Sequence, residues 1–223
     1  MLSKADIVVS LIVGELSAWL LIAIARSLGI TSSAIWSLPI VFPLLCLLGL
    51  YVAARIAAKI AVIYQIAKFI LIGGFNTLLD WGILAALIFI FRQYFLVEPQ
   101  DKLAVILTLG LVYYSFYKAI SFVVAAVSSF FWNRFWTFKR ETTESMSQEF
   151  FQFLIVTFVG FLINVGIASS VFKFVHPFGG LNYDQWAIAA AVVATIFSMV
   201  WNFLGYKFIV FNEKPAETKP VSI

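Results

Sequence analysis

The chain has 223 residues, of which 63% are hydrophobic and 12% are charged, and its formal net charge is +4. A soluble domain carries about 25% charged residues, so this composition excludes a soluble globular protein and indicates an integral membrane protein. The charge is not a nucleic-acid signature, because in a membrane protein its meaning depends on where the lysines and arginines lie. The single cysteine, Cys46, excludes an internal disulfide bond.

Six stretches of the chain are long and apolar enough to cross a bilayer, for which a helix needs about 20 mostly apolar residues. In chain order they cover residues 7–25, 34–54, 69–91, 119–138, 151–175 and 186–211. We therefore predict an all-α polytopic membrane protein with six transmembrane helices. Glu15 interrupts the first stretch, which is unusual in a signal-peptide core, so we expect this stretch to be a retained helix.

One apolar stretch, residues 101–117, is too short to be a further span. It could form a re-entrant or interfacial helix, or it could extend the fourth span outward. The tyrosines at its end suit the headgroup level of a membrane, where amphipathic rings settle.

Lysines and arginines indicate the orientation. If the amino terminus lies inside, ten of the fifteen fall on the inner side and five on the outer side. This bias favours a multi-pass protein of the cytoplasmic membrane with both termini in the cytoplasm.

The sequence repeats itself after its second span. The paired segments are residues 68–83 with 152–167, and residues 129–138 with 202–211. Each copy holds two spans, so both copies enter the membrane from the same side and form parallel repeats. The second copy departs from the pattern of the first, for example where Thr157 stands for Gly73 and Tyr206 stands for Asn133.

Two strings of the first copy resemble the GtrA-like family of small bacterial and archaeal membrane proteins. They are GGFNTLLD at residues 73–80 and NRFWTF at residues 133–138. Residues 153–164 and 202–211 carry the resemblance into the second copy.

The resemblance divides the chain into three parts. Residues 68–211 are predicted to be a four-helix transmembrane core, with repeats at about 68–139 and 152–211. Residues 1–67 are an added two-helix segment, and residues 212–223 are predicted to be a disordered cytoplasmic tail.

The resemblance implies work on polyprenyl-phosphate-linked sugars. Members of the family are thought to flip such lipids across the cytoplasmic membrane for polysaccharide synthesis or glycosylation. Alternatively, a member assists the glycosyltransferase that makes the lipid without transporting it, here through the inner segment 140–148 and the tail. The four-helix plan is also similar in topology to the dimeric small multidrug-resistance transporters, so a proton antiporter and a homodimer are further alternatives.

No enzymatic activity is expected. The sequence shows no zinc-ligand spacing, no Ser-His-Asp order, no phosphate-binding glycine loop and no pair of glycosidase carboxylates. We therefore expect no metal and no cofactor.

Asp80 is the leading candidate for a substrate-binding residue. It follows Lys68 by 12 residues, about 18 Å along a helix, which places it inside a hydrocarbon core about 30 Å thick. An intramembrane carboxylate is costly and usually faces a cavity or a partner. It could bind a sugar hydroxyl or couple to protons, or it could form a structural pair with a lysine or arginine of another helix. Asn76, one turn earlier, and Asn164, the repeat counterpart of Asp80, would line the same polar groove.

Cations near the membrane surfaces are candidates for binding the lipid phosphate. Lys118 is expected at the outer surface, whereas Arg134 and Lys207 are repeat counterparts at the inner ends of their helices. The alternative is positive-inside anchoring for Arg134 and Lys207 and snorkelling for Lys118. Asn133, next to Arg134, completes the predicted substrate-binding residues.

Glu15 is a second intramembrane acid and a candidate proton or charge site. Arg26 is 11 residues further along, about 16 Å on one helix, so a partner on another helix is expected instead.

Overall fold

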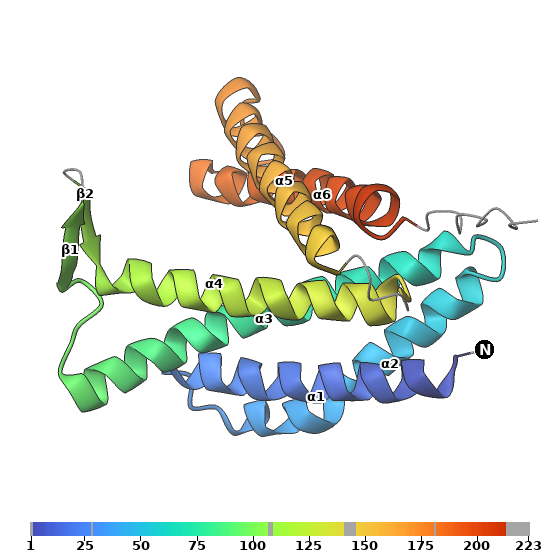
Figure 1. Cartoon of the computed structure of the whole chain (residues 1–223), viewed down its shortest axis with the longest axis horizontal. Coiled ribbons are helices and arrows are strands. Elements are labelled where there is room, and N and C mark those ends of the chain that lie inside the picture. Colours follow the sequence, from blue (N-terminus) through green and yellow to red (C-terminus); the bar gives the residue numbers. More distant parts are fainter. Residues whose placement is uncertain (1, 28, 107–108, 141–145, 181, 213–223) are drawn as a thin grey trace, which may run out of the picture. The chain divides into compact units, whose positions relative to one another are not determined.

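A computed structural model describes residues 2–27, 29–106, 109–140, 146–180 and 182–212. Six helices in these ranges are long and apolar enough to cross a membrane, which confirms the predicted all-α polytopic fold (Figure 1). The chain forms two compact units, Met1–Lys139 and Arg140–Ile223, and each is described by itself.

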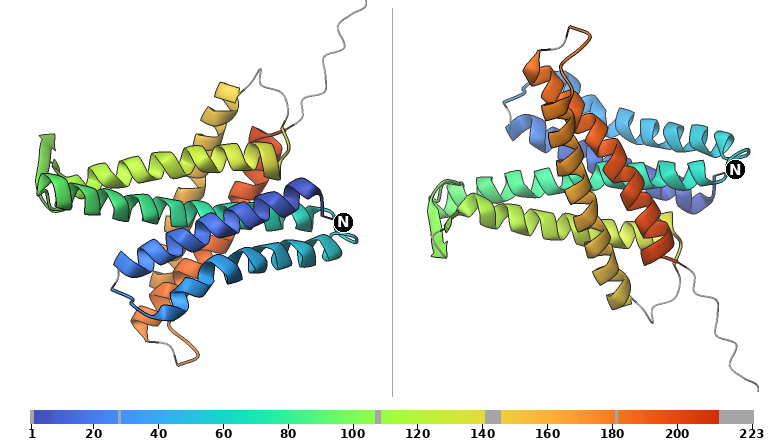
Figure 2. Two further views of the ribbon diagram at one scale, coloured as in Figure 1. Left: turned by 90° about the horizontal axis from the view of Figure 1, so that it is seen from below. Right: turned by 90° about the horizontal axis from the view of Figure 1, so that it is seen from above.

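The first unit contains four of these helices. They are α1 (Lys4–Ser27), α2 (Leu38–Ile56), α3 (Val62–Phe95) and α4 (Tyr113–Trp132). A short 3-10 helix, Ser33–Ser37, precedes α2, and a π-helical segment, Asn133–Thr137, continues α4. Within this unit α1 packs on α2 and α3, and α4 lies alongside α3 (Figures 1 and 2).

Local sequence explains where the first two helices begin. At the start of α1 the backbone N–H of Asp6 donates to Ser3 Oγ over 3.1 Å, and Ser3 Oγ donates to Asp6 Oδ2 over 2.7 Å. This exchange is related to a capping box, in which side chains satisfy the free N–H groups of a first turn. Pro39 stands in the first turn of α2, where its missing N–H costs nothing.

The core of the first unit gathers residues from three helices and the π-helical segment. Its buried members are Val13, Leu50, Ile72, Phe75 and Trp136. Helices α1 and α2 approach closely at Gly14, where an added Cβ would lie 2.5 Å from the Cα of Pro43. Small residues at helix contacts permit such close packing inside membranes.

The region between α3 and α4 is a β-hairpin. Strands β1 (Lys102–Ile106) and β2 (Leu109–Val112) pair antiparallel, with Lys102 opposite Val112 and Ile106 opposite Leu109. A re-entrant or interfacial helix over residues 101–117 was therefore the wrong expectation, and only the part from Tyr113 onward extends the fourth span. The run is rich in β-branched and aliphatic residues and is short, which suits a strand pair better than a helix.

The second unit is a helix pair, α5 (Met146–Phe174) and α6 (Tyr183–Gly205), and a π-helical segment, Tyr206–Val210, continues α6. The two helices pack closely at Gly160. A Cβ added to Gly160 would lie 2.2 Å from the Oδ1 atom of Asn202. Trp201 Nε1 also donates to the carbonyl oxygen of Val156 over 3.0 Å. The predicted tail lies outside the described residues except for Asn212.

The π-helical segments stand at corresponding places in the two units. Asn133–Thr137 follows α4 directly, and Tyr206–Val210 follows α6 directly. Their first residues, Asn133 and Tyr206, are the two that the predicted repeat pairs with each other. This likeness supports the repeat, which stays a prediction.

Candidate functional site

Asp80 is held between two side chains of the neighbouring helix. Its Oδ2 forms an ion pair with Lys118 Nζ, and its Oδ1 accepts a hydrogen bond of 2.6 Å from Ser121 Oγ. Lys118 and Ser121 are three residues apart on α4, so they lie on one face of that helix. The structure thus brings together Asp80 and Lys118. From the sequence, Asp80 was expected in a groove inside the membrane and Lys118 at its outer surface.

The Asp80–Lys118 pair is only partly covered by protein. The side chain of Asp80 is 17% exposed and that of Lys118 is 39% exposed, whereas Ser121 is fully buried. A carboxylate accepts hydrogen bonds from hydroxyl groups, and an ammonium group donates to phosphate oxygens. The arrangement can therefore bind a sugar hydroxyl and a phosphate at adjacent positions. Among the described residues, no group of three or more His, Cys, Asp or Glu side chains could hold a metal ion.

The two asparagines of the first unit turn toward their own helices. Asn76 Nδ2 donates to the carbonyl oxygen of Ile72 over 2.8 Å, and Asn133 Nδ2 donates to that of Ser129 over 2.9 Å. Both side chains are buried, and neither Oδ1 atom accepts a hydrogen bond from the described residues. Each asparagine thus contributes a buried acceptor, and no hydrogen bond between described side chains joins Asn76 to Asp80.

Asn164 bonds across its helix pair in the same manner as its repeat counterpart. From α5, Asn164 Nδ2 donates to Ser198 Oγ on α6 over 3.2 Å, and Thr195 Oγ1 lies at 3.5 Å. Asp80 likewise bonds from α3 to α4. Asn164 belongs to the second unit, so a groove that it shares with Asp80 remains a prediction.

The two remaining predicted cations lie at matching positions in the π-helical segments. Arg134 is fully buried, and its guanidinium group lies 4.9 Å from the ring centre of Phe135. Lys207 Nζ lies 5.7 Å from the ring centre of Phe203 and 5.6 Å from that of Phe208. Both cations therefore sit against aromatic rings, which attract positive charge through their faces.

A further ion pair, which is buried, was missed by the sequence reasoning. Asp6 of α1 pairs with Lys68 of α3, and Trp136 Nε1 donates to Asp6 Oδ1 over 3.0 Å. The ammonium group of Lys68 also lies 4.6 Å from the ring centre of Tyr64 and 5.0 Å from that of Trp136. The only sequence signal for this cluster was an acid three residues after Ser3 at the start of an apolar run.

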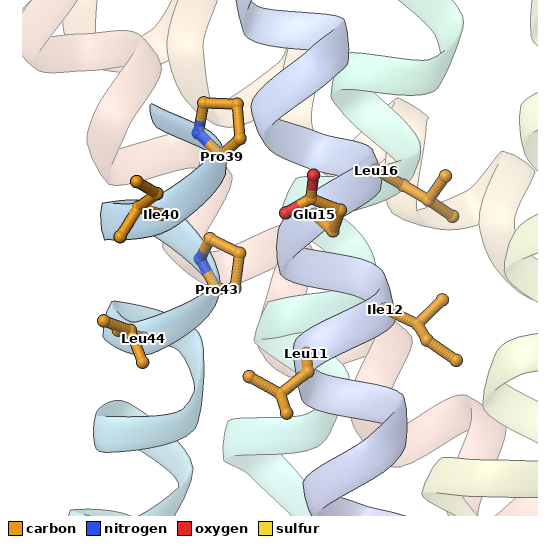
Figure 3. A pocket seen from close by; sticks show the side chains of 8 residues that line it. All are labelled: Leu11, Ile12, Glu15, Leu16, Pro39, Ile40, Pro43 and Leu44. Carbon is orange, nitrogen blue, oxygen red and sulfur yellow. The ribbon is translucent and has the colours of Figure 1, made fainter. Parts of the chain in front are cut away.

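Glu15 has its described partner on its own helix. Trp19 Nε1 donates to Glu15 Oε1 over 2.7 Å. No lysine or arginine of the described residues forms a salt bridge with Glu15, so the expected cationic partner on another helix is not found. The residue instead lines a groove between α1 and α2 (Figure 3).

The comparison with protein families matches the part of the chain that carries all the predicted substrate-binding residues. The GtrA/DPMS transmembrane domain matches residues 68–211, which is more than half of the chain and contains Asp80, Lys118, Arg134 and Asn164. No curated protein and no solved structure matches the chain. Helices α1 and α2 lie outside the matched residues. The chain therefore belongs to the GtrA/DPMS transmembrane-domain family, and so to the membrane proteins tied to polyprenyl-phosphate sugar metabolism.

Proposed function

We propose that the protein is a non-catalytic carrier that moves a polyprenyl-phosphate-linked sugar between the leaflets of the cytoplasmic membrane. Such a lipid would serve cell-surface polysaccharide synthesis or glycosylation. Family membership over residues 68–211 supports the substrate class. The observation that carries the proposal is the ion pair of Asp80 with Lys118 on two spanning helices of this segment.

The exposure of this pair favours a binding role over a purely structural one. The side chains of Asp6 and Lys68 are 6% and 3% exposed, so their pair is sealed inside the first unit. Those of Asp80 and Lys118 are 17% and 39% exposed, so a ligand can reach both charges. Exposure of a charged pair does not stabilise a helix contact. Ionisable residues inside a membrane usually mark a substrate or ion pathway.

In the proposed cycle, the two charges exchange partners. Without substrate, Lys118 neutralises Asp80. An arriving phosphate takes over the ammonium group of Lys118, and the freed carboxylate of Asp80 accepts a hydrogen bond from a sugar hydroxyl. Ser121 continues to donate to Asp80, so the freed carboxylate keeps hydrogen-bond donors while Lys118 holds the phosphate.

The other predicted residues would serve the same substrate. Arg134 and Lys207 would bind the phosphate at the cytoplasmic end of its path, where both termini also lie. Asn76 and Asn133 would offer their unpaired Oδ1 atoms to the sugar and Asn164 its amide group, while the lipid tail stays in the bilayer.

The test is transfer of a fluorescent polyprenyl-phosphate hexose across proteoliposomes that contain the full chain. Wild-type protein should accelerate transfer, whereas Asp80→Ala and Asp80→Asn should both reduce transfer to the rate of empty liposomes. Asp80→Asn keeps an acceptor for Ser121, so this variant should fold even if Asp80→Ala does not. Glu98→Gln is the matched control, because Glu98 pairs with Arg92 in an exposed bridge after the end of α3.

Two results would count against the carrier. Wild-type transfer by folded Asp80→Asn would remove Asp80 from the site. Absence of transfer by folded wild-type protein would reject the carrier and favour the alternative of a membrane partner for a glycosyltransferase.

A further inference from the structure

The added helices α1 and α2 form a groove of their own, outside the family-matched residues. It is a shallow, open groove with a volume of about 510 Å³. Figure 3 shows the carboxyl group of Glu15 on the side of α1 that faces Pro39 and Pro43 of α2. The other lining residues are aliphatic: Leu11, Ile12, Leu16, Ile40 and Leu44.

The charge of Glu15 lacks a counter-ion among the described residues. Glu15 lies about 16 Å along α1 from Lys4, near the middle of this 24-residue helix. The one described hydrogen bond to it, from the neutral indole of Trp19, reaches Oε1 and leaves Oε2 without a partner. The guanidinium group of Arg26 instead lies 5.6 Å from the ring centre of Trp36. A carboxylate so deep in a membrane normally has a cation beside it.

The prolines form part of the α2 wall of the groove. Pro43 lies inside α2 and has no N–H, so the helix cannot supply the usual hydrogen bond to the carbonyl group of Pro39. Both prolines line the groove, and the close packing of Pro43 against Gly14 fixes α2 beside α1 at this depth. The lining side chains therefore offer one carboxylate and otherwise apolar surface, and none of them is a hydrogen-bond donor.

We propose that this groove binds a lipophilic ammonium ion that enters from the bilayer, with Glu15 as its counter-ion. The charge complementarity selects this ligand: an ammonium group pairs with the Glu15 carboxylate and donates to its Oε2, while the hydrocarbon part of the amine covers the aliphatic lining. An anionic phospholipid would bring like charge to Glu15, and an uncharged lipid would leave the carboxylate without a counter-ion. The site is separate from Asp80 and does not depend on the proposed carrier.

The test compares two probes on purified full-length protein in a non-ionic detergent. The probes are a dansyl-labelled long-chain primary amine and the alcohol of the same chain length, and dansyl fluorescence reports binding. The wild-type protein should bind the amine more tightly than the alcohol. Glu15→Gln, which keeps an acceptor for Trp19, should weaken amine binding about tenfold and leave alcohol binding unchanged.

Two further variants complete the design. Glu98→Gln removes the same charge far from the groove along the sequence and should bind the amine as the wild type does. Leu44→Trp fills the groove without changing its charge and should weaken binding of the amine.

Equal binding of the amine by the wild type and Glu15→Gln would overturn the proposal, and so would equal binding of the two probes by the wild type. If Glu15→Gln fails to fold, binding of the amine by Leu44→Trp tests the proposal. Binding equal to that of the wild type would show that the amine does not occupy the groove. Transfer of the polyprenyl-phosphate sugar by Glu15→Gln should equal that of the wild type, so failure here and failure of the carrier are distinguishable.

Discussion

Asp6 and Lys68 form a buried ion pair that joins α1 to α3. Lys68 is the first residue of the family-matched segment, whereas Asp6 belongs to the added helices. The carboxylate also accepts hydrogen bonds from Ser3 and from Trp136, so its charge is shared among three donors. The added segment thus contacts the family-matched residues through an ion pair as well as through apolar packing.

The first prediction concerns this pair. Lys68→Met should leave the Asp6 carboxylate buried without its cation and lower the free energy of unfolding by about 3–5 kcal/mol. The double variant Asp6→Asn with Lys68→Met should recover part of that loss, because no uncompensated charge remains. The double-mutant cycle compares the wild type, Asp6→Asn, Lys68→Met and the double variant. Their free energies of unfolding are measured by denaturant unfolding in detergent, followed by tryptophan fluorescence. Additive effects of the two single variants would show that the pair is not coupled.

The second prediction separates binding from structure at Asp80. Exchanging the residues, Asp80→Lys with Lys118→Asp, keeps opposite charges across α3 and α4 but reverses which helix carries the acid. The exchanged protein should fold with a midpoint of thermal unfolding near that of the wild type. Its rate of lipid transfer should fall about tenfold or more, since a charged hydrogen bond to substrate is lost. A transfer rate equal to that of the wild type would assign the pair to structure alone.

The third prediction tests the contact of α1 with α2. Gly14→Ala places a methyl group against the backbone of Pro43, which cannot move aside as a side chain can. The free energy of unfolding should fall by about 1–3 kcal/mol. Gly49→Ala is the control, because nothing lies within 4 Å of the added Cβ at that glycine of α2. Equal stability of the two variants would contradict the close helix packing.

Thr157 and Tyr206 stand at two of the positions where the second repeat copy departs from the first. Thr157 Oγ1 donates to the carbonyl oxygen of Phe153 over 2.7 Å and lies 2.8 Å from the hydroxyl group of Tyr206. The single hydroxyl proton of Thr157 is already used, so Tyr206 is the donor in the second bond. Tyr206→Phe should therefore lower the free energy of unfolding by about 1 kcal/mol. Denaturant unfolding of Tyr206→Phe and of Tyr206→Phe with Thr157→Ala measures the coupling, and zero coupling would show that the bond contributes nothing to stability.

This bond shows what the sequence could and could not reveal. The differences at residues 157 and 206 are visible when the copies are aligned, yet an alignment does not say that the two changed side chains meet. Contact depends on which faces of α5 and α6 pack together, and hydropathy does not define those faces. The same reason explains why the sequence separated Lys118 from Asp80, which are 38 residues apart and on different helices.

The spans themselves were predictable because the bilayer demands long apolar helices. Their ends were less so: the third span was expected at residues 69–91, and α3 runs from Val62 to Phe95. Hydropathy measures the apolar stretch, whereas a helix continues into its polar flanks as long as its backbone bonds are satisfied. The hairpin was missed because a short apolar run has no decisive period.

The π-helical segments have a consequence for how these helices tolerate change in length. The N–H of Phe138 bonds to the carbonyl oxygen of Asn133, and that of Phe211 bonds to Tyr206, in each case five residues back rather than four. Each turn thus accommodates one residue more than an α-helical turn, and each helix ends there, because Phe138 and Phe211 are no longer helical. Removal of a single residue there would leave an ordinary α-helical last turn and rotate the side chains at the helix end by about 100°. Point substitutions should therefore be far better tolerated at these two helix ends than deletions of one residue.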